Sequence, residues 1–81
     1  METILIVEDK ESMAAMLKET LESGGYKVIS AYDGLQGINY LREGKVDLVL
    51  TDLKLPQKDG IDVLMASKEE NQFRPVIIMT A

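Results

Sequence analysis

The sequence predicts an α/β fold, a parallel β-sheet with helices packed on its faces. Short runs of apolar, mostly β-branched residues alternate along the chain with longer segments in which apolar residues recur at helical spacing. One of these runs, residues 46–51, is apolar almost throughout, which is typical of a strand buried on both faces. Alternating strands and helices of these lengths imply right-handed crossovers and a parallel sheet. We therefore expect residues 1–81 to form one small domain.

Four segments have the composition of strands. The first stops abruptly at an acidic pair, and its β-branched residues favour a strand over the start of a helix. The second alternates imperfectly and carries polar residues, so we expect it near an edge of the sheet. The fourth follows Pro75, which is tolerated at the first position of a strand because its missing N–H is not yet needed there. The expected strands are residues 4–7, 26–31, 46–51 and 76–80.

Three amphipathic helices are expected between these strands. They run from Lys10 to Gly24, from Asp33 to Gly44, and from Asp59 or Gly60 to Glu70. Glycines follow the first two helices as common terminators, and Asp33 can cap the second together with Gln36 in the manner of a capping box. The residues expected to face the core are Met13, Met16, Leu17, Thr20 and Leu21 in the first helix, Leu35, Ile38 and Leu41 in the second, and Ile61, Leu64, Met65 and Lys68 in the third.

Composition and charge exclude several classes of function. The chain has 9 Lys and Arg against 14 Asp and Glu, a net charge of −5, which disfavours contact with nucleic acid. Cysteine and histidine are both missing, so the usual zinc ligands and the usual general base are excluded, and a bound metal would be a hard cation such as Mg²⁺. The N-terminus does not resemble a signal peptide, and no apolar run approaches the roughly 20 residues needed to cross a membrane. We expect a cytoplasmic protein without membrane contact.

Side chains that carry oxygen follow three of the four strands. Glu8 and Asp9 follow the first strand, Asp52 follows the third and Thr80 follows the fourth. The carboxyl ends of parallel strands meet at one edge of a sheet, where open α/β sheets bind their ligands. Carboxylates gathered there repel one another, and an oxygen-bound Mg²⁺ would neutralise them. Asp52 could then act as a nucleophile, because carboxylates form acyl-phosphate intermediates, and Thr80 could donate its hydroxyl to the transferred group.

Each of these residues also has a simpler interpretation. Asp52 could be an ordinary strand-end residue, Asp9 could cap the first helix, and Thr80 could be only a strand residue. A nucleotide- or flavin-binding site is a poorer alternative, because it would need a glycine-rich loop after the first strand. This chain has the acidic residues Glu8 and Asp9 at that point, which would repel phosphates.

Three motifs together resemble the receiver domain of two-component response regulators. They are Ile4-Leu5-Ile6-Val7-Glu8-Asp9, Leu50-Thr51-Asp52-Leu53-Lys54-Leu55-Pro56 with Asp59-Gly60, and Pro75-Val76-Ile77-Ile78-Met79-Thr80-Ala81. The second and third motifs resemble, more narrowly, the receivers of nitrogen-regulatory-type transcription activators. The resemblance implies a flavodoxin-like parallel sheet with strand order 2-1-3-4. It also implies a (βα)3β fragment that lacks the last helix, strand and helix of the family.

The resemblance gives a role to each residue of the acidic edge. Asp52 would accept a phosphoryl group from the phosphohistidine of a sensor histidine kinase. Asp9, Asp52 and the backbone carbonyl of Lys54 would hold Mg²⁺, while Glu8 would act through water or by orienting the site. Thr80 would contact the phosphoryl group and shift on phosphorylation.

The family continues, beyond the end of this chain, with a strand that delivers an essential lysine. We therefore expect a truncated receiver with impaired phosphotransfer. The resemblance implies a signalling domain rather than an enzyme. It also implies that Ala81 keeps open the space beside Thr80. An Asp-nucleophile phosphatase is a poor alternative, because the family that it would resemble has a second Asp two residues after the nucleophile, where this chain has Lys54. The remaining alternative is an interaction module that is not phosphorylated and forms a homodimer. It would pair through residues 76–79, an apolar exposed edge of the sheet.

Overall fold

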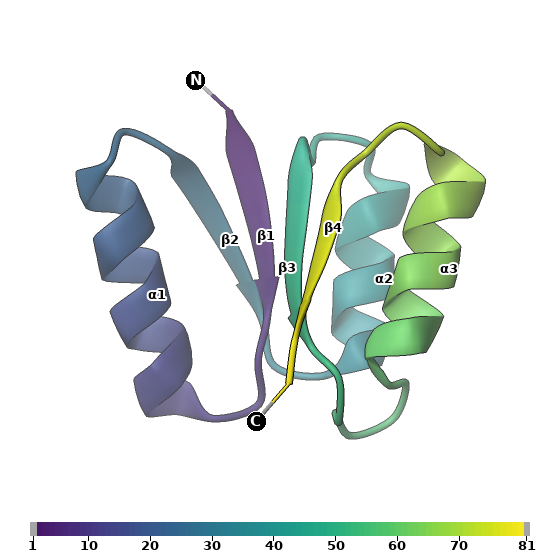
Figure 1. Ribbon diagram of the computed structural model, residues 1–81, viewed down its shortest axis with the longest axis horizontal. Coiled ribbons are helices and arrows are strands. Elements are labelled where there is room, and N and C mark those ends of the chain that lie inside the picture. The colour runs from purple at the N-terminus through teal and green to yellow at the C-terminus, as the bar shows by residue number, and fades with distance from the viewer. Residues whose placement is uncertain (1, 81) are drawn as a thin grey trace.

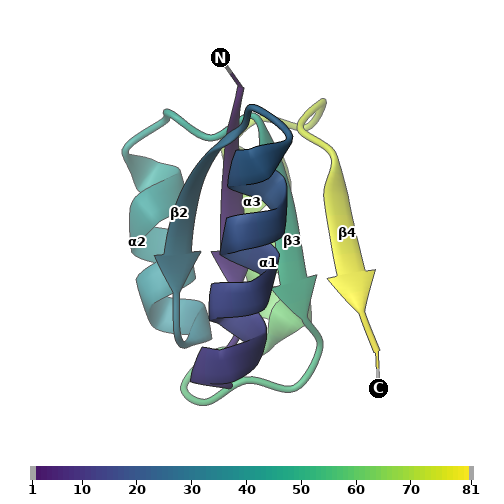
Figure 2. The same ribbon diagram turned by 90° about the vertical axis from the view of Figure 1, so that its left-hand side faces the viewer.

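The computed structural model describes residues 2–80, which form one parallel sheet with helices on both of its faces (Figure 1). The elements are β1 (Thr3–Val7), α1 (Glu11–Ser23), β2 (Lys27–Ala31), α2 (Gly34–Arg42), β3 (Leu48–Asp52), α3 (Gly60–Glu70) and β4 (Val76–Met79). The strand order is β2-β1-β3-β4. Helix α1 covers one face of the sheet, and α2 and α3 lie side by side on the other (Figures 1 and 2). The predicted fold class and strand order are confirmed.

The register of the sheet brings the carboxyl ends of its strands together. Strands β1 and β3 are its centre, and in their parallel pairing Val7 lies level with Thr51. The residues that follow β1 therefore lie beside Asp52, the last residue of β3. Strand β2 is at an edge, as its polar residues predicted. Strand β3 begins at Leu48, two residues later than expected. Just before it, the Asp47 N–H donates to the Thr3 carbonyl at 2.9 Å, and the Asp47 side chain accepts from the Thr3 N–H at 2.7 Å.

The two faces of the sheet are buried to different extents. The core beneath α2 and α3 consists of Leu5, Val7, Ala31, Ile38, Leu41, Val46, Val49 and Val63. The core beneath α1 is smaller, with Ile4, Ile6 and Val28 buried and four leucines packed against them that are only partly buried. Covering by a single helix explains the difference, since α1 contacts β1 and β2.

The predicted inward faces of the helices are partly wrong. In α3, Ile61 and Met65 are exposed, and the buried residues are Gly60, Val63 and Ser67. These smaller residues let the helix approach the sheet and α2 closely, so the bulkier apolar residues point away. The second helix buries Ile38 and Leu41 as predicted. Its third expected core residue, Leu35, is exposed.

The first helix buries less of its apolar stripe than expected. Ala14 is its only buried residue among those that the structure describes, and both Met13 and Met16 are exposed. Leu17 and Leu21 lie against the smaller core. Asp9 does not cap this helix. The N-cap is Lys10, and no side chain of the described residues bonds to the first turn.

Aspartates cap the other two helices. Asp33 accepts a hydrogen bond from the Gln36 N–H at 2.7 Å, as predicted for α2. The reciprocal bond of the predicted capping box differs, because the Gln36 side chain accepts from the Tyr32 N–H instead of that of Asp33. In α3 the box is complete, with Asp59 and Asp62 each accepting from the backbone of the other. This second box holds the end of the loop that follows β3.

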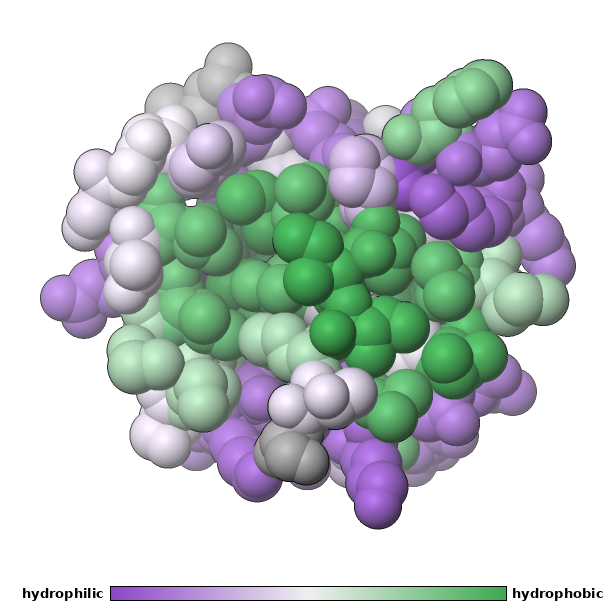
Figure 3. Space-filling view, in the orientation of Figure 1, coloured by the Kyte–Doolittle hydropathy of each residue, from purple (hydrophilic) through white to green (hydrophobic). Residues whose placement is uncertain are grey.

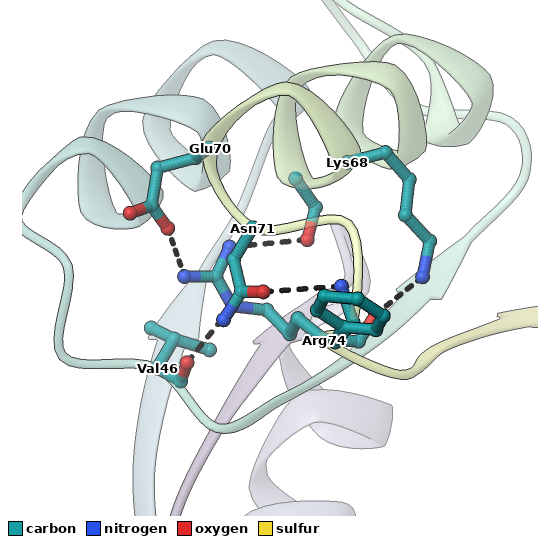
Figure 4. A network of polar contacts seen from close by, with 7 residues as sticks. Val46, Lys68, Glu70, Asn71 and Arg74 are labelled. Atoms are coloured by element: carbon teal, nitrogen blue, oxygen red, sulfur yellow. Dashed lines mark hydrogen bonds and ion pairs between the residues drawn. The ribbon is translucent and has the colours of Figure 1, made fainter.

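A buried arginine joins three segments at the opposite end of the sheet (Figure 4). Arg74 is 3% exposed, and its guanidinium donates to the Val46 carbonyl at 2.8 Å and to the Ser67 hydroxyl at 3.1 Å. It also forms an ion pair with Glu70. The carbonyl of Arg74 accepts from the Lys68 ammonium. The contacts hold the start of β4 against α3 and the start of β3, in a segment where the sequence predicted only a connection.

Apolar side chains gather around the free edge of β4 (Figure 3). On the α1 side a hollow of about 340 Å³ is lined by Glu2, Ile4, Leu21, Tyr26, Leu48, Leu50 and Ile77. We call this area the β4 surface. Its lining is mainly apolar and offers a single carboxylate, whereas Mg²⁺ is usually bound by more than one oxygen ligand from the protein. Across residues 2–80, no helix is long and apolar enough to cross a membrane.

Candidate functional site

Three carboxylates meet at the carboxyl edge of the sheet. Glu8 and Asp9 follow β1, and Asp52 ends β3 beside it. One carboxylate oxygen from each of the three residues lies within 4.8 Å of those of the other two. The parallel register produces this grouping, because two adjacent central strands end at the same level.

The three carboxylates differ in their surroundings. Glu8 is 5% exposed and accepts a hydrogen bond from the Lys10 N–H at 3.0 Å, which fixes its side chain beneath the surface. Asp52 is half-buried, and its Oδ1 accepts from the Leu53 N–H at 2.9 Å. Asp9 is exposed and faces solvent. The arrangement therefore offers one buried, one half-buried and one accessible carboxylate to a common point.

A hollow of about 370 Å³ opens at this edge of the sheet. It is lined by Asp9, Lys10, Asp52, Leu53, Lys54 and Thr80. The structure thus places Asp9, Asp52, Lys54 and Thr80 around one space, with Glu8 close to the two aspartates. Ala81, predicted to leave room beside Thr80, lies outside the described residues.

The loop between β3 and α3 carries Lys54 and is closely held. The Leu53 N–H donates to the Met79 carbonyl at 3.1 Å, and the Leu53 carbonyl accepts from the Gly60 N–H at 2.7 Å. A Cβ at residue 60 would lie 2.3 Å from the Asp52 carbonyl oxygen, so the approach of α3 to the end of β3 requires glycine. The sequence placed Asp59-Gly60 only at the start of the third helix and in the second motif. It did not reveal that Gly60 packs against the backbone of Asp52.

The donor set at this edge fits Mg²⁺. Its three carboxylates offer hard oxygen ligands, and Mg²⁺ in proteins is bound by one or a few carboxylates together with water. Among residues 2–80 no lysine or arginine forms an ion pair with Glu8, Asp9 or Asp52, so no salt bridge within this part of the chain balances their negative charge. The hollow beside Asp9 and Asp52 leaves room for water and for a further ligand.

The fold and this acidic edge define a class of protein that sequence comparison identifies. The model of the response regulator receiver domain matches residues 4–81, and the chain belongs to this family. Transcriptional regulatory protein CpxR of Escherichia coli is 43% identical over 81 residues, covering 100% of this chain and 34% of that protein. Transcriptional regulatory protein DltR of Streptococcus agalactiae is 40% identical over 78 residues, 96% of this chain and 35% of that protein. The chain thus spans about a third of the length of these relatives.

Solved receiver structures share the fold closely. The non-phosphorylated HemR receiver domain from Leptospira biflexa superposes with a TM-score of 0.93 and 34% identity, covering 100% of this chain and 65% of that one. The response regulator TrrA from Thermotoga maritima, solved in complex with Mg²⁺-BeF, has a TM-score of 0.93 and 30% identity over 100% of this chain and 70% of its own. The recognition of the receiver family is therefore confirmed. The narrower resemblance to nitrogen-regulatory-type activators stays a prediction.

Proposed function

We propose that Asp52 is the phosphoacceptor of this receiver domain and that a sensor histidine kinase is the donor. The observation that carries the proposal is the grouping of Asp52 with Glu8 and Asp9, beside a hollow that Thr80 also lines. Receiver domains are signalling domains that interact with sensor histidine kinases. Comparison with these relatives favours this function over an interaction module that is never phosphorylated.

The residues of the edge can divide the transfer between them. The Asp52 carboxylate attacks phosphorus, a new P–O bond forms, and the P–N bond to the kinase imidazole breaks with its electron pair moving to nitrogen. The Leu53 N–H holds Asp52 Oδ1 and orients the carboxylate for the attack. The Thr80 hydroxyl, on the rim of the same hollow, donates to an oxygen of the phosphoryl group.

Mg²⁺ would be held by Asp9, Asp52 and the backbone carbonyl of Lys54, with Glu8 acting through water. When bound, it neutralises negative charge on the phosphoryl oxygens and on the carboxylates. The TrrA complex with Mg²⁺-BeF supports this assignment, because its chain shares the fold over the whole of this one. We place the function in the cytoplasm, without direct contact to nucleic acid.

Replacing Asp9 by Asn is expected to weaken Mg²⁺ binding by at least about tenfold, since even residues that only orient a metal ligand contribute 10- to 100-fold. Asp9 is exposed and caps no helix, so the fold should be retained. Isothermal titration with MgCl2 measures the affinity. Glu69→Gln removes one exposed carboxylate from α3 and serves as the control. Equal affinities for Asp9→Asn and the wild type would contradict the metal assignment.

We also propose that residues 1–81 in solution form a two-fold dimer through the edge of β4. The side chain of Ile77 is 51% exposed on this edge strand and lines the β4 surface. An unpaired apolar edge strand readily pairs with a second copy. The three carboxylates of the acidic edge lie at the ends of β1 and β3, whereas Ile77 lies within β4.

Ile77→Lys is expected to shift the chain from dimer to monomer, because lysine on an edge strand opposes pairing with another chain. Sedimentation equilibrium measures the change. Leu35→Lys is the matched control, because Leu35 is exposed to a similar extent, 46%, but does not lie on β4. It belongs to α2, a helix that contacts β1 and β2. A wild-type chain that stays monomeric at high concentration would rule out the dimer.

A further inference from the structure

The loop from Leu53 to Asp59 presents the Lys54 carbonyl between two anchors. At one end, Leu53 is bonded through both its N–H and its carbonyl, to Met79 and Gly60. Lys54 itself, within the part of the chain that the structure describes, makes no backbone hydrogen bond, so its carbonyl is free to accept a ligand. The second anchor holds the loop beyond Lys54 and is provided by α2.

That second anchor is Gly34, the first residue of α2. Its N–H donates to the Pro56 carbonyl at 3.3 Å, two residues beyond Lys54. A Cβ at residue 34 would lie 1.7 Å from the Lys58 carbonyl oxygen and 2.7 Å from the Lys58 Cβ. The first N–H groups of a helix have no partner inside the helix, so this donor is available to the loop. Only glycine lets the helix approach the loop this closely.

The loop is tightly folded where it meets Gly34. The Lys58 N–H donates back to the Pro56 carbonyl at 2.9 Å, and Gln57 between them has a φ of 70°. A non-glycine residue in this left-handed region costs free energy and persists only where the surroundings hold it. The Pro56 carbonyl accepts from both Gly34 and Lys58, so one oxygen links the turn to α2.

We infer that Gly34 is a positioning residue for Mg²⁺: its contact with the loop sets the place of the Lys54 carbonyl. The inference rests on the proposed function and extends it to Gly34, which precedes the phosphoacceptor Asp52 by 18 positions. Gly34 is not among the residues that line the hollow beside Asp9 and Asp52. A methyl group at residue 34 displaces the backbone of the loop. The displacement reaches Lys54 because Lys58 is only four positions further along the chain and the Leu53 end of the loop is fixed.

Gly34→Ala is expected to lower the affinity for Mg²⁺ at least about tenfold, as the loss of a residue that orients a ligand does. Isothermal titration with MgCl2 measures this at a temperature where circular dichroism shows both proteins folded. Gly44→Ala is the matched control. Gly44 follows the other end of α2, has a φ of 73° and has no atom within 4 Å of its Cβ position, so alanine there is strained without touching the loop. The Gly44→Ala substitution should lower the melting temperature by several degrees and leave the affinity for Mg²⁺ within about twofold of the wild-type value.

Hydrogen exchange in the wild-type chain tests the same coupling without a variant that could misfold. If the contact of Gly34 with Pro56 places a metal ligand, Mg²⁺ must by linkage stabilise that contact. Saturating Mg²⁺ should then slow exchange of the Gly34 amide at least about fivefold more than that of the Gly44 amide, which donates to Leu41 at 3.0 Å. Equal slowing of the two amides would overturn the inference.

The outcomes separate this inference from the proposed function. Wild-type protein that binds no Mg²⁺ would overturn both. Wild-type protein that binds Mg²⁺, with Gly34→Ala binding equally well, would overturn only the role of Gly34. An affinity loss in Gly44→Ala as large as that in Gly34→Ala would show a general effect of instability and would also overturn it.

Discussion

Asp52→Asn is expected to abolish phosphorylation of the chain. Wild-type protein treated with Mg²⁺ and a small acyl-phosphate donor should gain a single phosphoryl group, at the reduced rate that impaired phosphotransfer implies. The variant should gain none, a loss of at least about 100-fold. An amide oxygen can still accept from the Leu53 N–H, as Asp52 Oδ1 does at 2.9 Å, so the local structure should be kept. The amide is not nucleophilic enough to attack phosphorus. Intact-protein mass spectrometry measures the result.

A second substitution of Asp by Asn provides the control. Asp33 caps α2, and Asn is as good an N-cap residue, so Asp33→Asn removes a carboxylate without disturbing the helix. This variant should be phosphorylated like the wild type. Phosphorylation retained in Asp52→Asn, or a wild-type chain that accepts no phosphoryl group, would contradict the proposed function.

Arg74→Met is expected to lower the free energy of unfolding by about 3 kcal/mol, the range found when one partner of a buried polar network is removed. The substitution leaves the Val46 carbonyl and the Ser67 hydroxyl without their donor. Glu70 is 38% exposed and remains hydrated, so the loss of the ion pair adds little. Urea denaturation followed by circular dichroism gives the free energy.

Two variants qualify this result. Arg42→Met removes an exposed arginine from α2 and should change the free energy of unfolding by less than about 0.5 kcal/mol. Arg74→Lys should restore little, because a lysine ammonium cannot reproduce the planar fork that reaches Val46, Ser67 and Glu70 together. A loss below about 1 kcal/mol in Arg74→Met would mean that the network contributes little to stability.

Local sequence patterns were sufficient to predict the elements of the fold and their order. Each strand is a short run with apolar residues, the apolar residues of each helix recur at helical spacing, and alternation of strands and helices permits few topologies. The acidic edge could be predicted for the same reason. Once Glu8, Asp9 and Asp52 are placed at the ends of parallel strands, the register must bring them together, and their oxygen atoms do lie within 4.8 Å of one another.

Close approach between segments could not be predicted from these patterns. Ile61 and Met65 gave α3 an apolar stripe, yet Gly60, Val63 and Ser67 face the sheet. Periodicity measures how apolar each face is, whereas burial depends on which face fits most closely against its neighbours. Gly34 looked only like the residue after a helix cap, and the carbonyl of Lys58 that requires it lies 24 residues further along the chain.

The sequence by itself determined the α/β architecture and the set of carboxylates at one edge, because periodicity is a local property and the strands of a parallel sheet share one direction. The strand order was predicted only through the resemblance to the receiver family. The tertiary structure alone decided which helix faces are buried, that Arg74 is buried in a polar network, and that Gly34 and Gly60 clasp the loop bearing Lys54. These features depend on contacts between distant residues. Arg74 and the Val46 carbonyl, for example, are 28 positions apart, and only the folded chain brings them together.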